Sequence, residues 1–190
     1  MVSKASRAIA GAAMVVASVI SVQPREASAQ ALSDRSVAVL MEYAWTILPT
    51  KFTTRENKVI VVDKSKKAEI VIPADVGRDV IGVARLSAYA QICNLPNAQS
   101  ANYRAMMGVE RKKNKWSDQQ LLYISQLHLF TILWLTGNVE ITSEDGQKNI
   151  ALKEGKDRKK PTCTDAERSN VRAQIKAYVE KITGKKVVTQ

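Results

Sequence analysis

The run LLYISQLHLFTILWL, residues 121–135, decides the fold class, because it is the most apolar stretch in the body of the chain. Its fifteen residues fall short of the roughly 18 or more expected of a membrane span, and polar side chains such as Ser125 and Thr131 interrupt it. Helix-capping residues bracket it on both sides: Ser117 and Gln120 before it, and Gly137 after it. Apolar residues occur nearly all around this helix, so we expect it to be the central helix of a globular core, from about residue 118 to 136.

The rest of the chain predicts four more helices from apolar residues at helical spacing. They cover residues 33–48, 75–94 and 98–112, and a last segment from the capping box of Thr164 and Glu167 to Gly184. Two β-branched runs, KVIVVD (58–63) and AEIVIP (68–73), predict a hairpin around the linker 64–67, and Asp145-Gly146 predicts a second one. The expected fold is a single compact domain, mainly α with about five helices, one or two short β-hairpins and one disulfide.

The N-terminal residues have the three parts of a secretory signal peptide. Lys4 and Arg7 form a positive region, residues 8–22 form an apolar one, and Ala27-Ser28-Ala29 is a small-x-small cleavage motif. We therefore expect a cleaved signal peptide over 1–29 and one mature domain over 30–190, periplasmic or secreted, without a transmembrane span. Cleavage would lower the formal net charge of +11 by two and leave the mature chain at about +9.

Cys93 and Cys163 are the only cysteines in the sequence. In an oxidising compartment such a pair predicts one disulfide. The bridge would close a loop of about seventy residues, which chain-entropy reasoning values at roughly 4 kcal/mol. The alternative is a catalytic cysteine served by His128, but nothing in the local sequence would supply the low-pKa thiolate that it needs. Two cysteines and one histidine far apart also give no closely spaced pair of metal ligands, so we expect neither metal nor cofactor.

His128, the single histidine, lies in the central helix near Ser125 and Asp118. Three groups on one rigid helix do not converge as a catalytic triad, and the sequence has no glycine-rich elbow, phosphate loop or dinucleotide fingerprint. A lone histidine on an apolar helix is more often a hydrogen-bonded core or boundary residue. We therefore predict no catalytic residues, while a hydrolase of envelope polymers, whose carboxylates meet only in the fold, stays open as an alternative.

The surplus of positive charge is the feature that favours binding. Three basic groups are candidates for an anionic ligand or partner: Lys64, Lys66 and Lys67; Arg111, Lys112, Lys113 and Lys115 with Trp116; and Lys156, Arg158, Lys159 and Lys160. If they converge, they would attract an anionic envelope component or an acidic protein. Nucleic acid fits the charge but not the compartment. The alternative is that these residues only solvate loops. The expected function is a non-catalytic binding or structural role in the cell envelope.

The segment CTDAERSNVRAQIKAYVEKI, residues 163–182, resembles the last helix of small periplasmic acid-stress chaperones. Those proteins are helical, have one disulfide, and carry a cysteine immediately before a basic terminal helix. The likeness covers twenty residues, and this chain is longer and has strand-like segments that the chaperones lack. The resemblance implies a chaperone-like stress role as an alternative to ligand binding.

Overall fold

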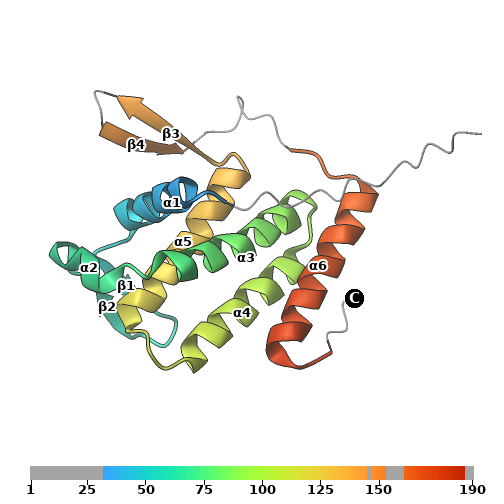
Figure 1. Ribbon diagram of the computed structural model, residues 1–190, viewed down its shortest axis with the longest axis horizontal. Coiled ribbons are helices and arrows are strands. Elements are labelled where there is room, and N and C mark those ends of the chain that lie inside the picture. The colour runs from blue at the N-terminus through green and yellow to red at the C-terminus, as the bar shows by residue number, and fades with distance from the viewer. Residues whose placement is uncertain (1–31, 145–146, 153–160, 187–190) are drawn as a thin grey trace, which may run out of the picture. The chain divides into compact units, whose positions relative to one another are not determined.

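The computed structural model describes residues 32–144, 147–152 and 161–186 (Figure 1). Within these residues the helices are α1 (Asp34–Ile47), α2 (Lys67–Ile70), α3 (Ala74–Ile92), α4 (Pro96–Lys112), α5 (Asp118–Leu135) and α6 (Asp165–Thr183), and a 3₁₀ turn, η1 (Lys64–Lys66), precedes α2. Two antiparallel hairpins pair β1 (Lys51–Thr53) with β2 (Val59–Val61) and β3 (Val139–Glu144) with β4 (Gln147–Leu152). The expected mainly α fold with short hairpins is confirmed.

The chain divides into two units, Met1–Ala31 and Leu32–Gln190, and every described residue belongs to the second. The expected signal peptide, residues 1–29, lies outside the described residues. Among the helices that the structure describes, none has the length and hydropathy needed to cross a membrane.

Helix α5 is the central element, as its apolar run predicts. The expected capping box is present: Ser117 Oγ accepts a hydrogen bond from the Gln120 N–H (3.2 Å), and the Gln120 side chain accepts one from the Ser117 N–H (3.0 Å). The helix ends where Gly137 adopts a left-handed φ of 69°. Its side chains pack against α1, α3 and α4, and the largest of its fully buried side chains are Tyr123 and Phe130. The sequence therefore predicts both the ends and the burial of this helix.

Helix α3 crosses α5 and also contacts α1, α4 and α6 (Figure 1). Close contact with α1 depends on Gly77, because a β-carbon at this position would lie 2.5 Å from Met41 Sδ. The Tyr123 hydroxyl donates a hydrogen bond to the Met41 carbonyl (2.8 Å) and joins α5 to the same part of α1. Helices α1, α3 and α5 thus enclose the main apolar core.

A second apolar cluster lies where α6 packs on α4 and α3. Its α6 side chains are Val171, Ile175 and Val179, one turn apart, as the helical spacing predicts. The predicted disulfide is confirmed: Cys93, just after α3, is bonded to Cys163, just before α6, with their Cα atoms 5.1 Å apart. The bridge therefore holds the first turn of α6 against the end of α3.

The predicted first hairpin is wrong in its pairing. Strand β2 pairs with β1, which precedes it, so that Phe52 lies opposite Ile60, and the run AEIVIP forms α2 and the approach to α3. Local hydrogen bonding explains the difference, because the Asp63 side chain accepts from the Ser65 N–H (2.9 Å) and starts a helical turn where a β-turn was expected. The hairpin predicted around Asp145-Gly146 is present as β3 and β4.

Candidate functional site

An open cleft of ≈ 850 Å³ lies between the β1–β2 hairpin and helices α4 and α5. We call it the hairpin cleft. The hairpin side is formed by Phe52, Thr53, Thr54, Arg55, Glu56, Lys58 and Ile60; the α4 side by Ser100, Tyr103, Arg104, Met107 and Arg111; and the α5 side by Asp118, Leu121, Leu122 and Ser125.

Regular secondary structure explains why these side chains share one cleft. The α4 residues recur every three or four positions, and so do those of α5, which is the spacing of one helix face. On the hairpin, Phe52 and Ile60 are opposite each other and therefore point to the same face, toward the cleft. Val61, one position further along β2, points to the other face and is 61% exposed. The side chain of Gln119 donates a hydrogen bond to the Val61 carbonyl (2.8 Å) and fixes β2 beside the start of α5.

The cleft has more positive than negative charge. Its lining includes four cations, Arg55, Lys58, Arg104 and Arg111, and two carboxylates, so the excess is two positive charges. Asp118 is neutralised by an ion pair with Lys58 at 2.6 Å. Arg104 and Arg111 are exposed and form no ion pair with any carboxylate of the described residues. These two guanidinium groups therefore remain available to a negatively charged ligand.

Glu56 keeps its negative charge beside these cations. Hydrogen bonds from its own backbone and from Thr54 hold the pKa of this carboxyl below its usual value, and the charges of Arg111 and Arg55 lower it further. The turn that carries Glu56 is closed by Asn57, which adopts a left-handed φ of 62°, and by a hydrogen bond from the Thr54 N–H to the Lys58 carbonyl (2.9 Å). Asparagine tolerates this conformation better than most residues, which explains how so short a hairpin turns.

The α4–α5 wall of the cleft has an apolar part, and two of its three hydroxyls are paired with each other. Met107 and Leu122 are buried, and the hydroxyls of Tyr103 and Ser125 form a hydrogen bond with each other at 2.7 Å. The Tyr103 ring packs on the imidazole of His128, with 5.1 Å between the ring centroids. His128 therefore lies behind the cleft wall rather than in it.

His128 belongs to a buried polar cluster, as expected of a lone histidine on an apolar helix. Its Nε2 is hydrogen-bonded to Ser87 Oγ (3.1 Å), and the Asn102 amide donates to Ser87 Oγ and to the Val83 carbonyl, both at 2.9 Å. His128 is 3% exposed, and burial lowers its pKa to about 4. The imidazole is therefore neutral at pH 7 and joins α3, α4 and α5.

The structure describes two of the three predicted basic groups, Lys64–Lys67 and Arg111–Lys115 with Trp116. Arg111 alone among them lines the hairpin cleft. Lys64 lies at η1, where its ammonium donates to the Trp45 carbonyl (2.7 Å) and lies 4.5 Å from the Trp45 ring centroid. Lys67 is paired with Glu42 at 2.5 Å, and Lys66 is exposed. Lys156, Arg158, Lys159 and Lys160 lie outside the described residues.

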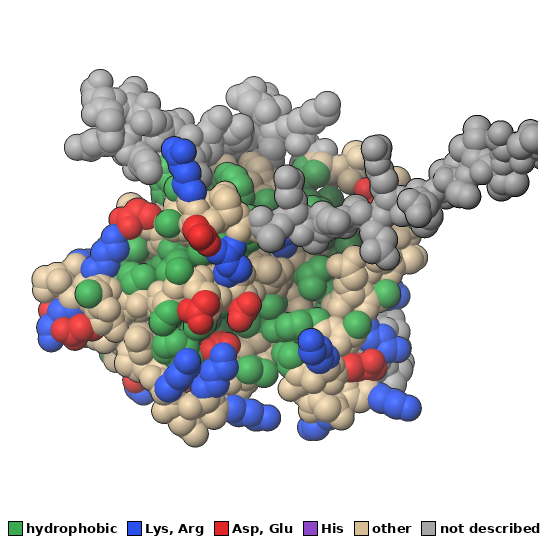
Figure 2. All heavy atoms as spheres, viewed as in Figure 1, with side chains coloured by type: hydrophobic (Ala, Val, Ile, Leu, Met, Phe, Trp, Pro, Cys, Tyr) green, Lys and Arg blue, Asp and Glu red, His purple; other side chains and the backbone are tan. Residues whose placement is uncertain are grey.

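The group at the end of α4 is partly structural. Trp116 Nε1 and Lys113 Nζ each donate to the buried Glu110 carboxylate at 2.7 Å, and Lys115 lies 4.3 Å from the Trp116 ring centroid. Lys112 is exposed. Figure 2 shows Lys and Arg side chains gathered where α4 ends, in the lower part of the view. This end of α4 is therefore positive, and the indole N–H of the half-buried Trp116 is engaged by Glu110.

Three cleft cations, Arg55, Lys58 and Arg104, were not among the residues predicted from the sequence. Arg104 lies on a helix whose sequence is polar along most of its length. Arg55 and Lys58 flank a turn that was not predicted from the sequence. The segment Arg55-Glu56-Asn57-Lys58 lies between two short runs with β-branched or aromatic residues. Because asparagine favours turns, this pattern could have predicted the hairpin that carries Arg55 and Lys58.

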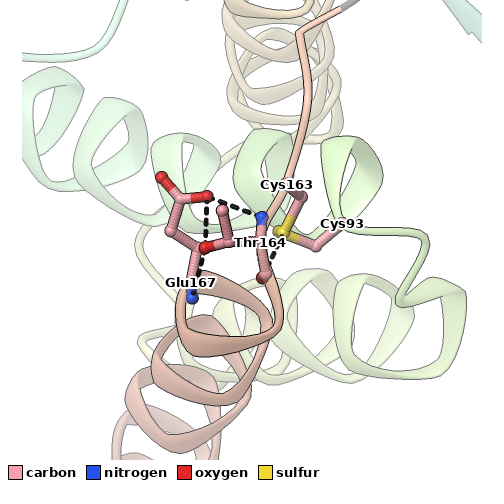
Figure 3. The surroundings of a disulfide bond; sticks show 4 residues. All are labelled: Cys93, Cys163, Thr164 and Glu167. Carbon is pink, nitrogen blue, oxygen red and sulfur yellow. Dashed lines mark hydrogen bonds between the residues drawn. A yellow bond between two sulfur atoms is a disulfide. The ribbon is translucent and has the colours of Figure 1, made fainter.

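A smaller groove of ≈ 310 Å³ lies beside the disulfide, between α3 and α6. Leu86, Tyr89 and Ile92 form its α3 side, and Val171 is among its α6 residues. Figure 3 shows how the adjoining residues start α6: Thr164 Oγ1 accepts from the Glu167 N–H (3.2 Å), and the Glu167 carboxylate accepts from the Thr164 N–H (2.7 Å). The one acidic or basic side chain in its lining is Glu167, which is already used in this cap, so the groove has no cation for an anionic ligand.

No family model matches the chain, and neither a curated protein nor a solved structure is significantly similar to it. The resemblance of residues 163–182 to acid-stress chaperones therefore rests on those residues alone. Among the His, Cys, Asp and Glu side chains that the structure describes, no three lie close enough to hold a metal ion.

Proposed function

We propose that this is an exported binding protein that holds a small anionic ligand in the hairpin cleft. The observation that carries the proposal is the pair of exposed guanidinium groups, Arg104 and Arg111, which share one cleft face and form no ion pair with the described carboxylates. Arginine binds carboxylate and phosphate through parallel charge-assisted hydrogen bonds, so such a pair suits an anionic group.

The size of the cleft favours a small ligand over an acidic protein. Ligand pockets commonly have volumes of about 300–1,000 Å³, and the hairpin cleft, at ≈ 850 Å³, lies within this range. A folded acidic partner would need a broad basic surface, whereas Lys64, Lys67 and Lys113 are each engaged with groups of this protein. We therefore place the anionic envelope component of the sequence-based expectation in this cleft, as a small molecule.

Export is the second part of the proposal. It is supported by the signal-peptide pattern of residues 1–29 and by the Cys93–Cys163 bridge, since disulfides persist in oxidising compartments. N-terminal sequencing of the protein isolated from its native cell envelope should give Gln30 as the first residue. A protein from the envelope that still begins at Met1 would contradict cleavage.

The ligand proposal is tested with two variants that each lose two positive charges. Arg104→Gln/Arg111→Gln changes the cleft, whereas Arg168→Gln/Lys176→Gln changes two exposed residues of α6 that do not line it. Calorimetric titration with pyrophosphate, butyl phosphate and octyl phosphate should show one site for at least one probe, weakened by salt. We expect the cleft variant to bind at least tenfold more weakly and the α6 variant to bind as the parent does. Equal weakening in both variants would indicate general attraction to a basic protein and would overturn the proposal.

A further inference from the structure

We infer that the ligand of the hairpin cleft is an amphiphilic anion, an acyl or aryl chain that carries one carboxylate or phosphate group. This inference rests on the proposed function and names the chemistry of its ligand. It comes from a juxtaposition in the cleft: cationic side chains lie beside an apolar surface formed by Phe52, Ile60, Met107, Leu121 and Leu122.

The apolar surface has an exposed half and a buried half. On the hairpin, Phe52 is 41% exposed although it faces the cleft, and Ile60 beside it is half-buried. Across the cleft, Met107 and Leu122 are buried, and Leu121 is half-buried. An apolar chain between these two sides would remove the Phe52 ring from water, which is favourable in proportion to the apolar area covered.

Four of the polar side chains beside this surface are engaged with each other in two pairs. Tyr103 and Ser125 share a hydrogen bond between their hydroxyls (2.7 Å), and Lys58 is paired with Asp118 (2.6 Å). A ligand part that lies against the apolar surface near these pairs would have to break them or leave its own polar groups unpaired, which is costly where water is excluded, so an apolar chain suits this part of the cleft. The negative charge of Glu56 at the hairpin turn would also oppose a ligand with several negative charges.

Either of the two unpaired arginines can bind an anionic head beside the apolar surface. Along α4 they alternate with Met107, since Arg104 precedes it by one turn and Arg111 follows it by one turn. A head group bound at either arginine therefore lies within one helical turn of the apolar surface. An amphiphile with one anionic head satisfies both features at once.

The affinities for probes that differ in chain length and in head charge test this inference separately from the proposed function. The probes are octyl phosphate, butyl phosphate and the neutral octyl glucoside, all below their micelle concentrations, with the mature chain. We expect octyl phosphate to bind at least tenfold more tightly than butyl phosphate and octyl glucoside. Phe52→Ser should reduce the octyl-to-butyl ratio severalfold, whereas Val61→Ser, which changes an exposed apolar residue on the opposite face of the hairpin, should leave it unchanged.

The other possible binding results overturn the amphiphile inference alone or together with the proposed function. If octyl and butyl phosphate bind equally and both depend on Arg104 and Arg111, the amphiphile is excluded while the anion site stands. If octyl glucoside binds as tightly as octyl phosphate, the head charge is irrelevant and both ideas fail. Equal loss in Phe52→Ser and Val61→Ser would show that the chain does not lie along the cleft face of the hairpin, and would overturn the inference. Cleft-dependent binding of none of the anionic probes would overturn both.

Discussion

Ser87 Oγ and His128 Nε2 lie 3.1 Å apart inside the contact between α3 and α5, and both residues are almost completely buried. Asn102 adds α4 to this contact, because its amide donates to Ser87 Oγ, while its own Oδ1 is buried without a hydrogen-bond partner in the described part of the chain. A polar cluster of this kind aligns three helices, because each hydrogen bond is made at only one relative placement of the two helices it joins.

The buried imidazole should make stability depend on pH. Burial lowers the pKa of His128 from 6.5 to about 4, so between these values the unfolded chain binds a proton that the folded protein does not. Stability is therefore lost as the pH falls from about 6.5 to about 4, by roughly 3 kcal/mol in all. We expect the parent protein to lose about 2 kcal/mol more than His128→Gln between pH 7 and pH 4.5, measured by urea unfolding. Equal losses in the two proteins would contradict a buried neutral histidine.

The disulfide should stabilise the fold mainly by lowering the conformational entropy of the unfolded chain. Cys93 and Cys163 are 70 positions apart, for which loop-closure entropy predicts roughly 4 kcal/mol. Urea unfolding with and without a reducing phosphine should show a loss of about this size for the parent and no effect of the phosphine on Cys163→Ala. An unchanged unfolding midpoint of the parent after complete reduction would contradict this account, as would two free thiols in the natively purified protein.

Two glycines of α3 give a matched test of the contact between α1 and α3. A β-carbon at Gly77 would lie 2.5 Å from Met41 Sδ, whereas one at Gly82 would meet nothing within 4 Å. Alanine in an exposed helix position stabilises by roughly 0.5–1 kcal/mol relative to glycine, so Gly82→Ala should be more stable than the parent. Gly77→Ala should be about 1–3 kcal/mol less stable than Gly82→Ala, because Met41 must move within a packed core. Thermal and urea unfolding of the two variants would show this difference, and equal stabilities would refute the close contact.

The features that were predicted correctly depend on local sequence. The ends of α5 follow from Ser117, Gln120 and Gly137, whose effects act within one helical turn. The Cys93–Cys163 bridge follows from counting, since two cysteines allow only one intramolecular pairing. His128 was predicted to be a hydrogen-bonded core or boundary residue from its apolar neighbours alone, but its partner Ser87 is on another helix and could not be named from the sequence.

The features that were missed depend on which segments meet in space. The β-branched run around Ile70 and Ile72 has the pattern of a strand, yet the Asp63 cap starts a helical turn before it and both isoleucines are buried. Arg55 and Arg104 are far apart in the sequence, and only the packing of the hairpin against α4 brings them to one cleft. The lysine-rich runs were predicted to be candidate binding residues. In the structure Lys64 donates a hydrogen bond to a backbone carbonyl, and Lys113 donates one to a carboxylate.

The account depends most on where an anion binds, and an NMR titration of the mature chain with octyl phosphate tests this directly. We predict that the amide shifts that change most belong to three segments around the hairpin cleft, residues 52–60, 100–111 and 118–125. The shifts should saturate at one ligand per chain and be lost in Arg104→Gln/Arg111→Gln. Changes concentrated at the lysines of residues 64–67, at the groove between α3 and α6, or spread evenly over basic residues would contradict the cleft as the binding site.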